Sequence, residues 1–166
     1  MFLLVTASLI LGLILILLIN RTSPPVAVEK DFYNQREAGR AALEGLEAEK
    51  FEEVCRLLLE KIGLLITTVG NDRKGRIEIT ALNPQPITGG EYLVHCALLP
   101  STQTIDSATV IALSDAVRAE RALKGILITT GYFSEEVSKI FEGSPLELIN
   151  GKRLSELLTE YHISPA

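Results

Sequence analysis

The chain has 166 residues, of which 47% are hydrophobic, and its formal net charge is −5. This length gives room for one domain of ordinary size, and the hydrophobic content excludes a disordered protein. The negative charge makes the whole protein a poor electrostatic partner for DNA phosphates, although a local basic groove can coexist with a negative total.

The chain opens with an apolar segment, residues 2–19, that contains no charged residue. At about 1.5 Å per residue, a helix of this length just crosses the hydrocarbon core of a membrane. No basic residue precedes the segment and no small-residue cleavage site follows it, which favours an uncleaved anchor over a secretory signal peptide. We therefore predict one N-terminal transmembrane helix, within residues 1–20.

The basic residues nearest to this segment all follow it: Arg21, Lys30, Arg36 and Arg40. Positive charge beside a membrane span tends to stay on the cytoplasmic side. We expect a single-pass protein of the inner (cytoplasmic) membrane, anchored through residues 2–19, with the rest of the chain facing the cytoplasm.

A juxtamembrane linker and a helix are predicted for residues 21–50. Ser23, Pro24 and Pro25 form a short, stiff connector, and Asp31–Leu46 is rich in Glu, Arg and Ala. The main domain is predicted for residues 51–162.

This domain begins with a helix and a strand. Apolar residues spaced three and four apart predict a helix from Phe51 to near Gly63, where a glycine suits the C-terminal cap. Residues Leu64–Val69 are apolar and β-branched, so they predict a short strand.

In the two segments on either side of the loop Asn83–Gly90, the side-chain pattern repeats every second residue, which is typical of strands. The loop Asn83–Gly90 contains two prolines and two glycines, so the pair predicts an antiparallel hairpin. If the apolar sides of both strands meet the core, Glu78, His95 and Ala97 share the other side. This placement depends on alternation alone.

The second half of the chain alternates between helices and strands. The predicted elements are a helix at Asp106–Leu123, a strand at Ile126–Thr130, a helix at Glu135–Phe141 capped by Ser134, a strand at Leu146–Ile149 and a helix at Leu154–Tyr161. This order indicates parallel crossover packing onto the sheet that the hairpin begins. The fold class is therefore α/β, with a mixed central sheet flanked by helices.

Four motifs follow one another in the domain: Phe51-Glu52, GRIEITA from Gly75, VHCA from Val94 and KGILITTGYFS from Lys124. In order and spacing they resemble the Mrr-type restriction endonuclease domain of the PD-(D/E)XK nuclease superfamily, from about Phe51 to Tyr161. The resemblance implies a restriction-endonuclease-like fold and, in an active enzyme, Mg²⁺-dependent hydrolysis of duplex DNA.

The resemblance assigns the family's acid position to Glu78, its glutamine position to His95 and its lysine position to Ala97, with Glu52 as a further acid. Glu78 and His95 are the candidate metal ligands, although the imidazole is a nitrogen ligand in a place that suits oxygen. Ala97 cannot orient water or offset charge on the phosphate, and losing such a group typically costs about a hundredfold or more in rate. Lys124 or Lys74 could replace the lysine.

The favoured interpretation is a membrane-anchored, degenerate Mrr-type domain that acts as a DNA-binding or protein-interaction module. An active metal-dependent endonuclease with a rearranged site is one alternative. An inner-membrane accessory protein with no nucleic-acid role, whose acidic domain binds a protein partner, is another. Glu78 and His95 would then be ordinary polar residues on a partly covered sheet.

Overall fold

The computed structural model describes residues 43, 45–72, 75–100, 102–134, 136–137, 141 and 143–165. The predicted membrane segment, residues 2–19, and most of the juxtamembrane helix lie outside these ranges. Within them, no helix is both long enough and apolar enough to cross a membrane.

The described helices are α3 (Ala48–Lys61), α4 (Ser107–Ala119) and α6 (Gly151–Glu160). The described strands are β1 (Leu65–Asn71), β2 (Ile77–Asn83), β3 (Gly90–Ala97), β4 (Thr104–Ile105), β5 (Lys124–Thr129), β6 (Tyr132–Phe133) and β7 (Leu146–Ile149). The predicted hairpin is β2 and β3, and the predicted α/β class is confirmed.

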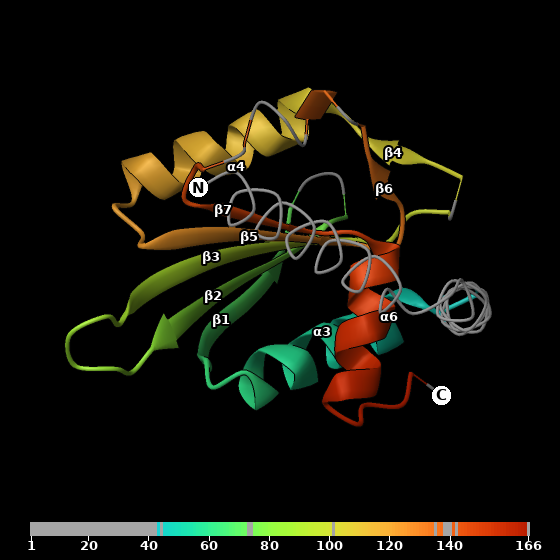
Figure 1. Ribbon diagram of the computed structural model, residues 1–166, viewed down its shortest axis with the longest axis horizontal. Coiled ribbons are helices and arrows are strands. Elements are labelled where there is room, and N and C mark those ends of the chain that lie inside the picture. Colours follow the sequence, from blue (N-terminus) through green and yellow to red (C-terminus); the bar gives the residue numbers. More distant parts are fainter. Residues whose placement is uncertain are drawn as a thin grey trace, which may run out of the picture. The chain divides into compact units, whose positions relative to one another are not determined.

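The main sheet has five strands in the order β1-β2-β3-β5-β7 (Figure 1). The pairs β1–β2 and β2–β3 are antiparallel, whereas β3–β5 and β5–β7 are parallel. The sheet is therefore mixed, as predicted, because a hairpin begins it and two crossover connections complete it. A separate parallel pair, β4 and β6, was not predicted.

Helices α3 and α6 cover one face of the sheet, and α4 covers the other (Figure 1). Under α3 and α6 lies the larger apolar core, into which the strands send alternate residues. Its members include Phe51 and Leu58 of α3 and Leu154 of α6, all at most 1% exposed. We call this side the α3/α6 face.

The opposite side, which we call the α4 face, has a smaller core. Val110, Leu113 and Val117 of α4 pack there with Leu93 and Leu127 of the sheet. Asp106 begins α4 as its N-cap, because its Oδ1 accepts a hydrogen bond from the Thr109 N–H at 2.8 Å. Of the two polar residues at this point of the sequence, Asp106 is the cap and Ser107 is the first residue of the helix.

Three helix boundaries differ from the predictions by three residues or more, and the first is that α3 begins at Ala48 rather than Phe51. Helix α4 ends at Ala119 rather than Leu123, and Arg121 adopts a φ of 56° that a continuing helix does not allow. Helix α6 begins at Gly151, three residues before the predicted start, because Asn150 accepts a hydrogen bond from the Arg153 N–H and caps it. The spacing of apolar residues predicts neither the positive φ of Arg121 nor the cap at Asn150.

The carboxyl end of β5 joins several segments. Thr130 Oγ1 accepts from the Leu99 N–H and donates to the Leu99 carbonyl, and the Gly151 N–H donates to the Gly131 carbonyl. The Thr129 hydroxyl donates to the carbonyl of Ala97 at 2.9 Å. The two threonines of KGILITTG, Thr129 and Thr130, thus bind the carboxyl end of β5 to the end of β3 and the residues that follow it.

Candidate functional site

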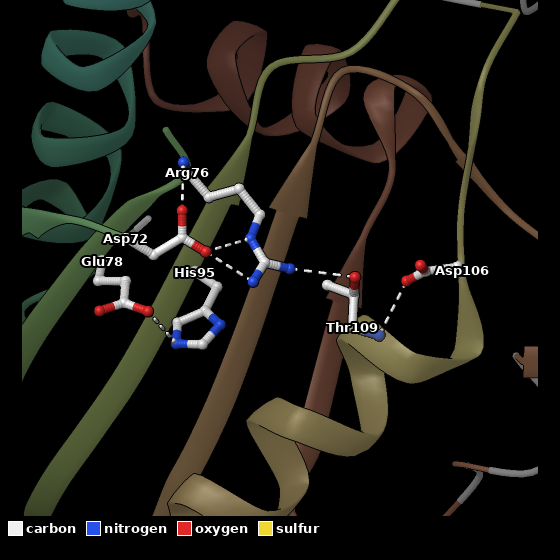
Figure 2. Close-up of polar contacts among 6 residues, drawn as sticks. All are labelled: Asp72, Arg76, Glu78, His95, Asp106 and Thr109. Carbon is white, nitrogen blue, oxygen red and sulfur yellow. Dashed lines mark hydrogen bonds and ion pairs between the residues drawn. The ribbon is translucent and has the colours of Figure 1, made fainter. Parts of the chain in front are cut away.

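Glu78 and His95 lie directly opposite each other on β2 and β3. Directly opposite residues of an antiparallel pair project on the same face, so both side chains lie on the α4 face. The Glu78 Oε1 is 3.6 Å from the His95 Nε2 (Figure 2). Glu78 is the more open of the two, since 48% of its side chain is exposed compared with 14% for His95.

Burial governs the charge of His95. Loss of solvent lowers the pKa of His95 below its ordinary value, and the Arg76 guanidinium adds to the decrease. The Glu78 carboxylate opposes the decrease without reversing it. The neutral imidazole is therefore favoured, and at 3.6 Å its contact with Glu78 is a weak electrostatic contact rather than a full ion pair near neutral pH.

Ala97 lies two residues beyond His95 on the same face, as the alternation predicted. It is only 3% exposed and belongs to the core beneath α4. The Ala97 side chain is a methyl group that packs against apolar neighbours and cannot donate a hydrogen bond.

A polar cluster that the motifs did not identify adjoins this pair. Arg76, immediately before β2, directs its Nε to the Asp72 Oδ2 at 2.7 Å, and its Nη1 donates to the Thr109 Oγ1 at 3.0 Å (Figure 2). Strand alternation predicts part of this cluster, since Arg76 precedes Glu78 by two residues and therefore projects on the same face. Its partners were not foreseeable, because Thr109 is distant in the chain.

Lys124, a candidate replacement for the missing lysine, lies at the wrong end of the sheet. It pairs in register with Tyr92, whereas Ala97 pairs with Thr129 at the other end of β5. At about 3.3 Å per residue, roughly 16 Å of strand separate the two positions. Lys124 instead forms an exposed ion pair with Glu147. Lys74 lies outside the described residues.

Glu52 belongs to α3, which packs against the α3/α6 face. Glu78 and His95 project from the α4 face. Glu52 therefore belongs to a helix on the opposite side of the sheet from these two residues. The basic residues Lys152 and Arg153 of α6 both form ion pairs with Glu156.

The donors near Glu78 do not fit a magnesium site. Mg²⁺ prefers an octahedral set of oxygen ligands, usually with one or two carboxylates, and retains water. Here the Glu78 carboxylate stands beside an imidazole, the nearby Asp72 carboxylate is paired with Arg76, and Ala97 adds no donor. Among the described residues, no group of three or more His, Cys, Asp and Glu side chains could hold a metal ion.

The order of elements defines the class of protein. A helix, three antiparallel strands, a crossover helix and a parallel strand, with the motif positions on β2 and β3, form a restriction-endonuclease-like α/β fold. The sequence model of the Mrr catalytic domain, described as a restriction endonuclease, matches residues 43–158. This match covers more than half of the chain, and the chain belongs to this family.

Similar solved structures include the DNA modification-dependent restriction endonuclease AspBHI, with a TM-score of 0.58 and 13% sequence identity over 80% of this chain. The MspJI restriction endonuclease in complex with a 27-mer oligonucleotide has a TM-score of 0.48 and 16% identity over 84% of this chain. The chain covers only 37% of the first protein and 33% of the second. A protein of unknown function, AF1548, has a TM-score of 0.49 and 16% identity, with 68% of this chain and 66% of that one covered. No curated protein sequence matches significantly.

Proposed function

We propose that this protein binds duplex DNA through a restriction-endonuclease-like domain that no longer cleaves it. The observation that carries the proposal is Ala97, a buried methyl group at the position that the sequence resemblance assigns to the family's lysine. A positioned cation near the reacting phosphate typically contributes about a hundredfold or more to the rate. Position 97 itself supplies no such cation.

The neighbouring residues support the same conclusion. Glu78 carries one methylene more than an aspartate, which moves its carboxylate by about one bond length relative to the strand, and such shifts matter in organised sites. His95 offers an imidazole whose Nε2 faces the Glu78 carboxylate. A site in which Glu78 stands beside an imidazole, Asp72 is paired with Arg76 and position 97 holds no lysine favours binding without hydrolysis.

We further propose that residues 2–19 anchor the protein in the inner membrane with its domain facing the cytoplasm. The support is the uncharged apolar segment and the basic residues that follow it. A reporter fused to the C-terminus should then give a cytoplasmic signal. A periplasmic signal would contradict this orientation.

The nuclease question is tested with the full chain purified in detergent. We expect retention of labelled duplex DNA at low salt and no cleavage of plasmid DNA in Mg²⁺ or Mn²⁺. Metal-dependent cleavage that Glu78→Ala abolishes would instead establish an active enzyme with a rearranged site. Failure to bind duplex DNA even at low salt would leave a protein-interaction role.

A further inference from the structure

Arg76 lies opposite the position of the missing lysine. Strands β2 and β3 pair Glu78 with His95 and Ile77 with Cys96. Continued by one residue, this antiparallel register places Arg76 opposite Ala97. Opposite residues have Cβ atoms about 4.5–5.5 Å apart and share a face, so a long side chain at 76 meets a small one at 97.

The guanidinium group, at the far end of the Arg76 side chain, also lies near the residues that surround Ala97. Its hydrogen bond to Thr109 brings it to the first turn of α4 (Figure 2). Val110, the next residue of α4, belongs to the apolar cluster that contains Ala97. The strand register and the contact with α4 both place the positive charge of Arg76 on the α4 face. This charge comes from a residue next to β2, whereas a lysine at position 97 would have come from β3.

An internal carboxylate holds this charge. The Asp72 Oδ2 is 2.6 Å from the Arg76 Nη2 and accepts from its Nε, and the Asp72 Oδ1 accepts from the Arg76 backbone N–H at 2.8 Å. The two side chains are only 12% and 21% exposed. The guanidinium fork matches carboxylate and phosphate oxygens alike. Asp72 therefore occupies donors that a phosphate would use.

We propose that Arg76 is the phosphate-binding group of this site and that Asp72 is an internal competitor that keeps it closed. The ligand is a phosphate oxygen, from a nucleic-acid backbone or from inorganic phosphate. The nucleic-acid part rests on the DNA-binding function proposed above. Removing the charge of Asp72 should open the site, and removing Arg76 should eliminate it.

The test uses Asp72→Asn in the full chain, because asparagine keeps an oxygen for the Arg76 backbone N–H and loses the charge. Asp115→Asn is the matched control, since Asp115 pairs with Arg118 on an exposed part of α4. We expect Asp72→Asn to bind a labelled duplex about tenfold more tightly, the scale of one charge-assisted hydrogen bond. Inorganic phosphate should also raise its melting temperature.

The double variant Asp72→Asn with Arg76→Gln should show neither gain, and Arg76→Met, which keeps an unbranched apolar stem and removes the charge, replaces Arg76→Gln in this background if the glutamine variant does not fold. An equal gain in Asp115→Asn, which changes the net charge by the same amount as Asp72→Asn, would overturn the proposal, since only net charge would then matter. An equal gain in the double variant, whose net charge equals that of the wild type, would also overturn it, because Arg76 would not be needed. Unchanged duplex affinity and no response to phosphate in Asp72→Asn would also overturn it, and wild-type binding would still support the DNA function. Stabilisation by phosphate through Arg76 without duplex binding would support the phosphate site and refute the DNA function.

Discussion

The two faces of the sheet use the same strands for different purposes. On the α3/α6 face, β2 and β3 contribute Ile77, Ile79, Ala81, Val94 and Cys96 to the larger core, which two helices cover. On the α4 face, the same strands carry Glu78, His95 and Ala97, and one helix covers only part of the surface, so that Leu65 and Leu82 remain 54% and 41% exposed. Each face can change without the other because strand residues alternate.

This difference lets residues on the α4 face vary while the packing of the α3/α6 face is kept. Stability depends mainly on the α3/α6 face, where alternation and helix spacing both favour one packing arrangement. Glu78, His95 and Ala97, the positions that the sequence resemblance assigned to the motif, lie on the α4 face, next to the polar cluster of Arg76 and Thr109. Substitutions on the two faces should therefore differ in both size and kind of effect.

The largest effect should follow from Phe51→Ala on α3. Phe51 is fully buried in the larger core, and removing a buried phenyl ring typically costs about 3–5 kcal/mol. Urea unfolding of the full chain measures the loss. Glu53→Ala, on the exposed side of the same helix, is the control and should change the free energy of unfolding by less than about 0.5 kcal/mol. Similar losses in both variants would contradict the assigned face.

A smaller loss, about 1–3 kcal/mol, is expected for Gly125→Ala beneath α4. A Cβ at this position would lie 2.6 Å from the Leu146 Cδ2 and 2.8 Å from the Val117 Cγ2, which forces neighbouring side chains to move. Gly70→Ala on β1 meets open space and serves as the matched control. If Gly125→Ala is as stable as Gly70→Ala, the packing between α4 and β5 is looser than the structure indicates.

The smallest effect should be a change in pH dependence caused by His95→Gln. Because the folded pKa of His95 is lowered, the unfolded chain binds a proton first, and the folded state loses stability as pH falls from about 6.5 through the folded pKa. Arg76 favours the neutral form, whereas Glu78, Asp72 and Glu120 favour the charged one.

Glutamine at position 95 should remove this acid-dependent loss while leaving stability near pH 8 almost unchanged. Unfolding curves measured between pH 5 and pH 8 provide the comparison, with His162→Gln, at an exposed histidine, as the control. An identical pH dependence in wild type and His95→Gln would show that burial of the imidazole has been overestimated.

Local periodicity predicted much of the fold because side-chain direction in a strand depends on neighbouring residues alone. The shared face of Glu78, His95 and Ala97 follows from that periodicity, and the pairing of β2 with β3 follows from the loop between them. The helix boundaries at Ala119 and Gly151 were missed, since they depend on the positive φ of Arg121 and the cap of Asn150.

The polar cluster could be predicted only in part. Alternation placed Arg76 beside Glu78, but its hydrogen bond to Thr109 depends on how α4 packs over the sheet. The position of Lys124 needed the parallel register of β3 and β5, which apolar patterns do not determine. The family motif supplied the site positions, and the tertiary structure supplied their partners.

The junction at the carboxyl end of β5 has a consequence for local unfolding. The amides of Leu99, Gly131 and Gly151 are all bonded within this junction, although they belong to the end of the hairpin, the β5 exit and the start of α6. Segments that share hydrogen bonds tend to open as one cooperative unit. In native-state hydrogen exchange these three amides should therefore exchange with similar opening free energies, although more than fifty residues of chain separate the first from the last.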